Sequence, residues 1–159
     1  EQPHLKMALG SVAYDSEGVA TNARDIVKDG VLQGYVLSSY SARKLAMQTT
    51  GNAGGVHNLT VDSGENDFPA MLKQLGTGLL VTELMGQGLN MVTGDYSRGV
   101  AGFWVEEGAI VHPVEEITIA GNMRDMLLNI SNIGNDTFKN SSQYIGSVLI
   151  DEMTIASGK

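Results

Sequence analysis

The chain has 159 residues, a length typical of one domain, and its 42% hydrophobic and 18% charged residues are a globular rather than a disordered composition. A formal net charge of -8 without a cluster of Lys or Arg argues against a surface for nucleic acid or for anionic membranes. Because the sequence has no cysteine, disulfides, thiolate metal ligands and a cysteine nucleophile are excluded.

The first third of the chain is predicted to contain a hairpin and a short helix. The hairpin is expected around Asp29-Gly30, with strands at residues 26–27 and 31–37, because an acidic residue before glycine suits a turn with positive φ. A short helix is expected over residues 41–48, and the glycine-rich stretch 49–55 is typical of a loop.

A second helix is predicted to follow Asp67. Pro69 lies in its first turn, where proline is favoured, and Gly76 stands where a helix C-terminus ends. The apolar residues 79–84 then form a strand candidate.

The second half of the chain is predicted to contain another hairpin, around Glu107-Gly108. Its strands are expected at residues 103–106 and 109–112, on the same reasoning as for the first hairpin. Residues 116–119 alternate polar and apolar side chains, as a half-buried strand does, and residues 147–155 are a further strand candidate.

A third helix is predicted to begin at Asn122, a good N-cap residue, and to run to Ile133. Its apolar residues fall on one face, and Gly134 lies where a C-terminal cap belongs. Together the elements predict an α+β domain, dominated by antiparallel β-sheet, with two or three short helices. The spacing leaves open whether the sheet closes into a partial barrel.

The three histidines, His4, His57 and His112, are scattered along the sequence, and none has the helical spacing of a zinc-binding His-Glu-x-x-His motif. A metal site would have to gather distant residues, with Glu83 or Asp95 joining His57. Because a catalytic zinc usually takes three protein ligands, the pattern favours His57 as a turn residue and His112 as an exposed one.

Nucleophilic catalysis has one candidate segment, residues 94–99, which places Ser97 among glycines. The segment is not the Gly-x-Ser-x-Gly elbow, and no histidine that would act as a base lies near Ser97 in the sequence. A polar turn between two strands is the favoured interpretation.

A dense set of polar residues interrupts the apolar strands between residues 79 and 105. They form the candidate site: Glu83, Thr93, Asp95, Tyr96, Ser97 and Arg98. Such a set lines a groove that captures a peptide as an extra strand, with Arg98 gripping a carboxylate, or it forms a turn network that fixes the register of the sheet. The local pattern leaves both alternatives open.

Nearly the whole chain, from about Tyr14 to Ile155, resembles the C-terminal domain of the PmbA/TldD metallopeptidase family, on the PmbA (TldE) side. The resemblance is carried by the stretches Thr50–Leu59, Leu80–Gly88, Val92–Gly99, Ala101–Glu106, Pro113–Asn122 and Ile133–Asp136. The match is long and ordered, and is therefore more specific than any short motif.

The resemblance implies a peptidase system built from two related chains, TldD and PmbA, that trims peptides in peptide antibiotic maturation and antitoxin degradation. It implies that zinc is bound by the TldD-like partner, through a His-Glu-x-x-x-His motif and a cysteine. This sequence has neither, so no catalytic residue, metal ligand or cofactor is assigned to it. The family also carries the label "modulator of DNA gyrase", but the acidic charge argues against direct DNA binding.

We therefore expect a cytoplasmic, non-catalytic subunit domain, and not an enzyme by itself. It would pair with a TldD-like homologue or with itself, through a surface that includes Phe103 and Trp104, and bind peptide but neither nucleic acid nor membrane. The alternative is a metal-dependent or Ser/Thr peptidase in its own right, using Ser97 or Thr93. Because the sequence begins at Glu1 and family chains are roughly three times longer, residues 1–159 are expected to be a C-terminal domain whose N-terminal domain is absent.

Overall fold

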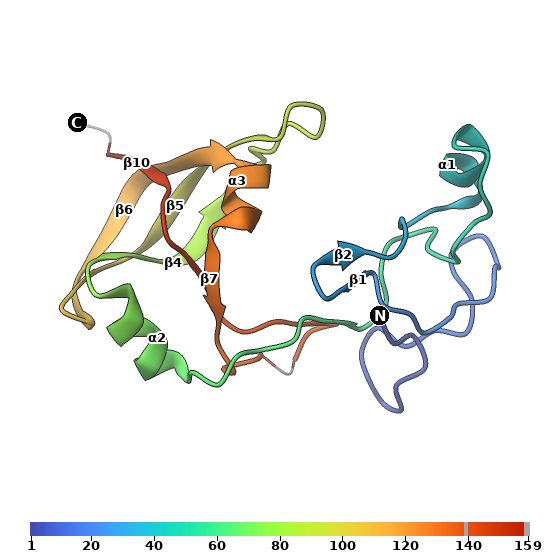
Figure 1. The fold of residues 1–159 in the computed structure, drawn as a ribbon, viewed down its shortest axis with the longest axis horizontal. Coiled ribbons are helices and arrows are strands. Elements are labelled where there is room, and N and C mark those ends of the chain that lie inside the picture. Colours follow the sequence, from blue (N-terminus) through green and yellow to red (C-terminus); the bar gives the residue numbers. More distant parts are fainter. Residues whose placement is uncertain (139, 158–159) are drawn as a thin grey trace. The chain divides into compact units, whose positions relative to one another are not determined.

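The computed structural model describes residues 1–138 and 140–157 (Figure 1). Contacts between residues divide the chain into two units. Unit 1 consists of Glu1–Asp62 and Thr137–Ile145, and unit 2 consists of Ser63–Asp136 and Gly146–Lys159.

An antiparallel sheet of four strands forms the centre of unit 2. In spatial order the strands are β10 (Thr154–Ser157), β6 (Ala109–Asn122), β5 (Asp95–Glu106) and β4 (Gly78–Met85). The side chains of Val100 and Val105 on β5 are fully buried, and Ile119 on β6 is 7% exposed. Among the described residues, β10 and β4 are free edges, so the sheet is open.

Both predicted hairpins are confirmed, and their turns have the backbone that the sequence indicated. β1 (Val27–Lys28) pairs with β2 (Val31–Leu32) in unit 1, and β5 pairs with β6 in unit 2. Asp29 and Gly30 have φ of 50° and 75°, and Glu107 and Gly108 have φ of 51° and 75°. Two successive residues with positive φ are the mark of the tight turn that matches strand twist. The predicted strand 31–37 is shorter than expected, because pairing stops at Leu32.

The predicted helix after Asp67 is confirmed as α2 (Phe68–Leu75). The Asp67 carboxylate accepts a hydrogen bond from the Ala70 amide at 2.9 Å, and Gly76 ends the helix with φ of 65°. Met71 is the buried residue of this helix. A cap at each end and one apolar face explain why eight residues form a helix here.

The helix predicted to run to Ile133 is wrong beyond Leu128. Helix α3 (Met123–Leu128) has the predicted N-cap Asn122, but it contains no fully buried residue. Ile130–Ile133 instead forms β7, which pairs with β9 (Val148–Ile150). β-branched isoleucines gain ladder hydrogen bonds and packing in that strand.

The single strand predicted over residues 147–155 is also wrong, because two partners divide it. β9 pairs with β7, whereas β10 pairs with β6 in a different sheet. Residues 151–153 connect the two strands and belong to neither.

Unit 1 contains little regular structure. Besides the β1–β2 hairpin it holds α1 (Ser39–Lys44), and β3 (Leu59–Thr60) pairs in parallel with β8 (Gln143–Tyr144). The helix predicted over 41–48 begins earlier, at N-cap Ser38, and ends earlier, since Ala46 has a positive φ of 53°. Loops therefore make up most of this unit.

The predicted α+β class is confirmed, with three helices and mostly antiparallel strands among the described residues. Within that same part of the chain, no helix is both long enough and apolar enough to cross a bilayer.

Candidate functional site

The candidate site residues lie along β4, β5 and the loop 86–94 that joins them. In Figure 1 this loop projects beyond the end of the sheet. The backbone pairing of β4 with β5 continues into the loop, because the Ser97 amide donates to the Gly88 carbonyl and the Asn90 amide donates to the Asp95 carbonyl, each at 2.8 Å. A side chain at Gly88 would collide with the carbonyl oxygen of Ser97, so the close approach of the two backbones requires glycine.

Thr93, Asp95 and Asn122 form a hydrogen-bonded cluster at the base of this loop. The Thr93 hydroxyl donates to Asp95 Oδ2 at 2.7 Å, and Asn122 Nδ2 donates to Asp95 Oδ1 at 3.4 Å and to the Thr93 carbonyl at 3.0 Å. Asn122 Oδ1 also caps α3 by accepting from the Arg124 amide. This part of the candidate site therefore ties the loop to the start of a helix.

The Arg98 guanidinium is turned onto backbone carbonyls. Its Nη2 donates to the carbonyls of Leu84, at 3.1 Å, and Gly86, and its Nε donates to that of Met85 at 3.4 Å. Of the two roles left open for Arg98, these bonds correspond to a network that holds the end of β4, and no carboxylate accepts from its guanidinium among the hydrogen bonds of the described residues.

Of the remaining candidate residues, Glu83 and Ser97 are exposed and Tyr96 is half-buried. Glu83 is exposed on β4, next to a register shift between Val81 and Glu83. Tyr96 and Ser97 line an open concavity of about 410 Å³ together with Asp95 and residues 87–90. Among the hydrogen bonds of the described residues, none joins the Ser97 hydroxyl to a histidine, so a Ser-His pair is not assembled.

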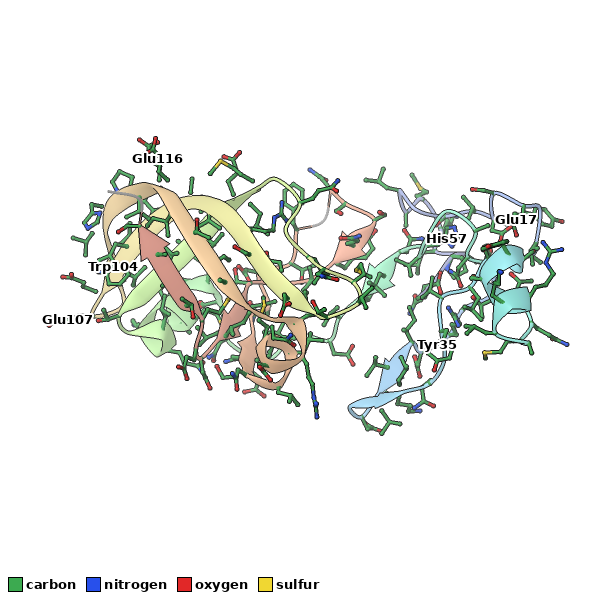
Figure 2. The ribbon with its side chains drawn as sticks, turned by 90° about the horizontal axis from the view of Figure 1, so that it is seen from above. Glu17, Tyr35, His57, Trp104, Glu107 and Glu116 are labelled. Atoms are coloured by element: carbon green, nitrogen blue, oxygen red, sulfur yellow. The ribbon has the colours of Figure 1, made fainter. Side chains whose placement is uncertain are left out.

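Each histidine has a separate set of neighbours. His4 Nε2 lies 3.1 Å from the Thr21 hydroxyl, His57 Nδ1 lies 3.2 Å from Glu1 Oε1, and His112 Nδ1 lies 3.1 Å from the Pro113 carbonyl. Figure 2 shows His57 among the side chains of unit 1. Across the described ranges, no three His, Cys, Asp or Glu side chains gather closely enough to hold a metal ion. The donor set of this part of the chain does not fit a catalytic zinc.

The aromatic pair expected at an interface lies at the far end of β5. Trp104 is paired with His112 and with Leu79 in the neighbouring strands, and its Nε1 donates to Glu106 Oε1 at 3.1 Å. Phe103 and Trp104 are both half-buried. Figure 2 shows the Trp104 side chain near this end of the sheet.

Sequence reasoning missed a polar network inside unit 1. The Glu1 carboxylate, 2% exposed, accepts hydrogen bonds from Asn52 Nδ2 at 2.7 Å, the His57 amide at 3.0 Å and Arg24 Nε at 3.2 Å. Burial by itself raises the pKa of Glu1, but hydrogen bonds from His57, Asn52 and Arg24 outweigh it and hold the pKa below its usual value. No local motif announces this network, since its members lie up to 56 residues apart.

Asp15 is a second carboxylate that connects backbone segments within unit 1. Its Oδ1 accepts from the amides of Glu17 and Val19, and its Oδ2 accepts from the Ala53 amide, all at 2.9 Å. Burial acts to raise the pKa of Asp15, but these three amides lower it below its ordinary value. No local pattern in the sequence indicates the bond between Asp15 and Ala53, which lie 38 residues apart.

Comparison with known proteins gives one consistent family. Residues 1–157 match the family model described as the PmbA/TldA metallopeptidase C-terminal domain. The chain is 58% identical to Metalloprotease PmbA of Escherichia coli O157:H7 and 53% identical to a PmbA homolog of Haemophilus influenzae, in each case over 98% of this chain and 35% of the relative. It thus spans about a third of the length of these curated relatives.

A solved structure gives the same result. The crystal structure of a Thermotoga maritima protein that bears the label modulator of DNA gyrase matches with a TM-score of 0.82 and 36% identity. The match covers 97% of this chain and 37% of that one.

Proposed function

This chain belongs to the PmbA/TldD metallopeptidase family, as part of its C-terminal domain, and on that premise we propose that it is a non-catalytic subunit domain of a two-chain peptidase. It supplies a surface for the partner chain and part of the surface that holds the peptide substrate. The partner is a TldD-like relative that carries the zinc, and the complex works in the cytoplasm.

The observation that carries this proposal is the dispersed donor set. A zinc that activates water needs about three protein ligands and one open position. Among the described residues, the imidazoles of His4, His57 and His112 each contact a different group, and no cluster of three donors forms. Hydrolysis by a zinc-bound water is therefore assigned to residues outside this domain, and we propose that the TldD-like relative supplies them.

The peptide surface is assigned to the outer edge of β4. Among the residues that the structure describes, this strand of eight residues pairs with β5 on one side only. Before Leu84, where Arg98 begins to occupy the carbonyls, an unpaired edge offers backbone donors and acceptors to an extended peptide, which binds with little dependence on its sequence. Glu83 and the register shift beside it lie in the middle of this edge.

The test is to mix this chain with a TldD-like relative and to measure cleavage of a flexible peptide. Cleavage is expected only when both chains are present, and a chelator should abolish it. A relative whose zinc-motif histidines are replaced by alanine is the matched control, and it should be inactive with or without this chain. Chelator-sensitive cleavage by this chain alone would overturn the proposal.

The alternative is a peptidase that uses Ser97 or Thr93. One observation favours it, namely the Thr93 hydroxyl donating to the Asp95 carboxylate at 2.7 Å, since a carboxylate can accept a proton from a nucleophile. The variants Ser97→Ala, Thr93→Ala and His57→Ala separate the two ideas. If the chain alone cleaves peptide and one of these variants abolishes that activity, the alternative is correct.

A further inference from the structure

Strand β4 carries one extra residue in the middle of the sheet. Thr82 is unpaired in the ladder, although Val81 before it and Glu83 after it are both paired. Their partners are successive residues of β5, Gly102 and Ala101. The Thr82 hydroxyl instead donates to the Ala101 carbonyl at 3.3 Å. An extra residue of this kind is a β-bulge, which interrupts the ladder and bends its strand.

Strand β6 carries an extra residue at the same level of the sheet. Glu115 and Glu116 together face Ala101, whereas the β5 residues on either side of Ala101 each pair with one residue of β6. Glu116 also has a φ of 57°, in the left-handed region that is unfavourable for residues other than glycine. The other register shift between β5 and β6, next to Trp104, has no counterpart on the β4 side. Within the described sheet, Ala101 therefore marks the one level at which pairing is interrupted on both sides of β5.

These interruptions form a line across the sheet, called here the bulge line, and they divide the sheet into two blocks. The hairpin block lies between the bulge line and the β5–β6 turn, and it contains residues 78–81, 102–106 and 109–114. The loop block lies on the other side, next to the β4–β5 loop, and it contains residues 83–85, 95–100, 117–122 and 154–157. Among the described residues, β10 pairs with residues 117–120 and does not cross the line.

Each block is attached to a helix of its own. In the hairpin block, the Gly108 amide donates to the carbonyl of Gly76, which ends α2, at 2.8 Å. In the loop block, Asn122 caps α3. Outside the sheet, Asn132 Nδ2 of β7 donates to Gln74 Oε1 of α2 at 2.7 Å. This bond is exposed to solvent, so water can replace it if the two blocks move.

We propose that the bulge line is a hinge about which the loop block bends relative to the hairpin block. Hinges are a few residues that absorb a change in backbone angles, and an interrupted ladder has fewer bonds to distort than a regular one. The loop block and its loop carry the candidate site residues, whereas Phe103 and Trp104 lie in the hairpin block. Bending at the line reorients the candidate site relative to this aromatic pair. The inference goes beyond the proposed function, because it depends on the sheet of this chain alone.

Residual dipolar couplings of the backbone amides test the hinge, because they report the orientation and the order of each block separately. The unmodified chain is labelled with the heavy nitrogen isotope and weakly aligned in a liquid-crystalline medium. The couplings of the two blocks should fit alignment tensors of different magnitude, since the block that moves more averages its couplings more strongly. Tensors of equal magnitude mean a rigid sheet and overturn the proposal.

A matched pair of variants then tests the position of the hinge. Glu116→Gly gives the bulge line a residue that tolerates more backbone angles, so it should widen the difference between the two tensor magnitudes. Glu107→Gly is the control, because Glu107 is also an exposed glutamate with a positive φ, 51°, but lies in the β5–β6 turn. In Figure 2, Glu116 lies on the curved part of β6 and Glu107 at the end of the hairpin. The control should leave the ratio of the magnitudes unchanged, and an equal response of the two variants would refute a hinge at this line.

Discussion

Unit 1 and unit 2 are stabilised by different kinds of interior. The buried polar side chains of the described residues lie in unit 1: Asp15, Thr21, Asn52 and Asn58. Unit 2 buries apolar side chains from a helix and from the sheet: Met71, Val100, Val105 and Ile119. Unit 1 also buries the apolar residues Leu37, Ala42 and Ala53. Its interior therefore combines apolar area with directional hydrogen bonds that only particular residues make, whereas the interior of unit 2 combines apolar area with ladder bonds that similar residues also supply.

The contrast between the interiors of the two units is clearest at Asn58 in unit 1, whose polar side chain is fully buried. Its Oδ1 accepts from the Gly10 amide at 2.9 Å, and its Nδ2 donates to the Gln2 carbonyl at 3.0 Å and to the Ser11 hydroxyl at 2.8 Å. Within the described residues, no buried side-chain nitrogen or oxygen lacks a partner. One side chain thus connects three loop positions that no strand or helix connects.

The largest expected effect follows from removing that connection. Asn58→Ala leaves buried partners without hydrogen bonds, so we expect it to destabilise unit 1 by about 3 kcal/mol. Hydrogen exchange measured by mass spectrometry should show faster exchange of peptides from residues 1–62. Asn22→Ala is the control, because Asn22 is exposed and makes one long bond, and it should have little effect. Equal effects of the two variants would remove the basis of the comparison between units.

A smaller loss of stability is expected when a side chain in the apolar interior of unit 2 is shortened. Val100→Ala removes two methyl groups from a site that is fully buried and should cost roughly 2 kcal/mol. Trp104 is the sole tryptophan and lies in the same sheet, so its fluorescence during urea unfolding measures the change. The identical substitution Val92→Ala, at a site 94% exposed, should leave the midpoint unchanged. A loss at Val92 as large as that at Val100 would contradict the assignment of the core.

These contrasts explain how much of the fold the sequence predicted. The elements of unit 2 were predictable where the apolar pattern agrees with a local signal, such as the turn residues Glu107-Gly108 or the helix cap Asp67. It was not predictable at residues 130–133, because an apolar periodicity that suits a helix also suits a strand, and pairing with β9 decides between them. Unit 1 has bonds between residues as distant as Glu1 and His57, which no local window contains.

The candidate site shows the same limit. The polar cluster around Asp95 was found from its composition, and the structure places Thr93 and Asp95 in direct contact. The orientation of Arg98 was not predictable, because nothing in the sequence distinguishes a carboxylate partner from a carbonyl partner. The exposure of Met91 and Val92 also went unnoticed, since apolar residues are expected inside a fold.

Acid should affect unit 1 before unit 2. Glu1, Asp15 and Glu17 of unit 1 have pKa values held below the ordinary 4.5 for Glu and 3.8 for Asp; for Glu17 the cause is the hydrogen bonding of Ser39. Because the folded-state pKa is the lower one, the stabilisation is complete above the ordinary values and is lost as the pH falls through the folded-state pKa.

Backbone amides provide a local measure of this acid effect. The Ala53 and His57 amides donate to Asp15 and Glu1, so their NMR shifts should change as the pH falls below about 4.5, before the amides of the β5–β6 hairpin change. Among the described residues of unit 2, Asp136 is the one comparable group. Burial acts to raise the pKa of Asp136, but hydrogen bonds from the Ser147 hydroxyl and amide hold this pKa below its usual value. If the amides of the β5–β6 hairpin change first, the prediction that acid acts first on the polar interior of unit 1 is wrong.

The smallest effect is expected where unit 2 uses a polar contact of its own, at the cap of α2. Asp67→Ala removes the acceptor of the Ala70 amide, which solvent can replace because the site is exposed, so the cost should be about 1 kcal/mol. Asp151→Ala is the control, since Asp151 is exposed in the same unit and its carboxylate is not a helix cap. Urea unfolding followed by Trp104 fluorescence compares both with Val100→Ala. An Asp67→Ala cost above that of Val100→Ala would mean that unit 2 depends on directional bonds more than on apolar area.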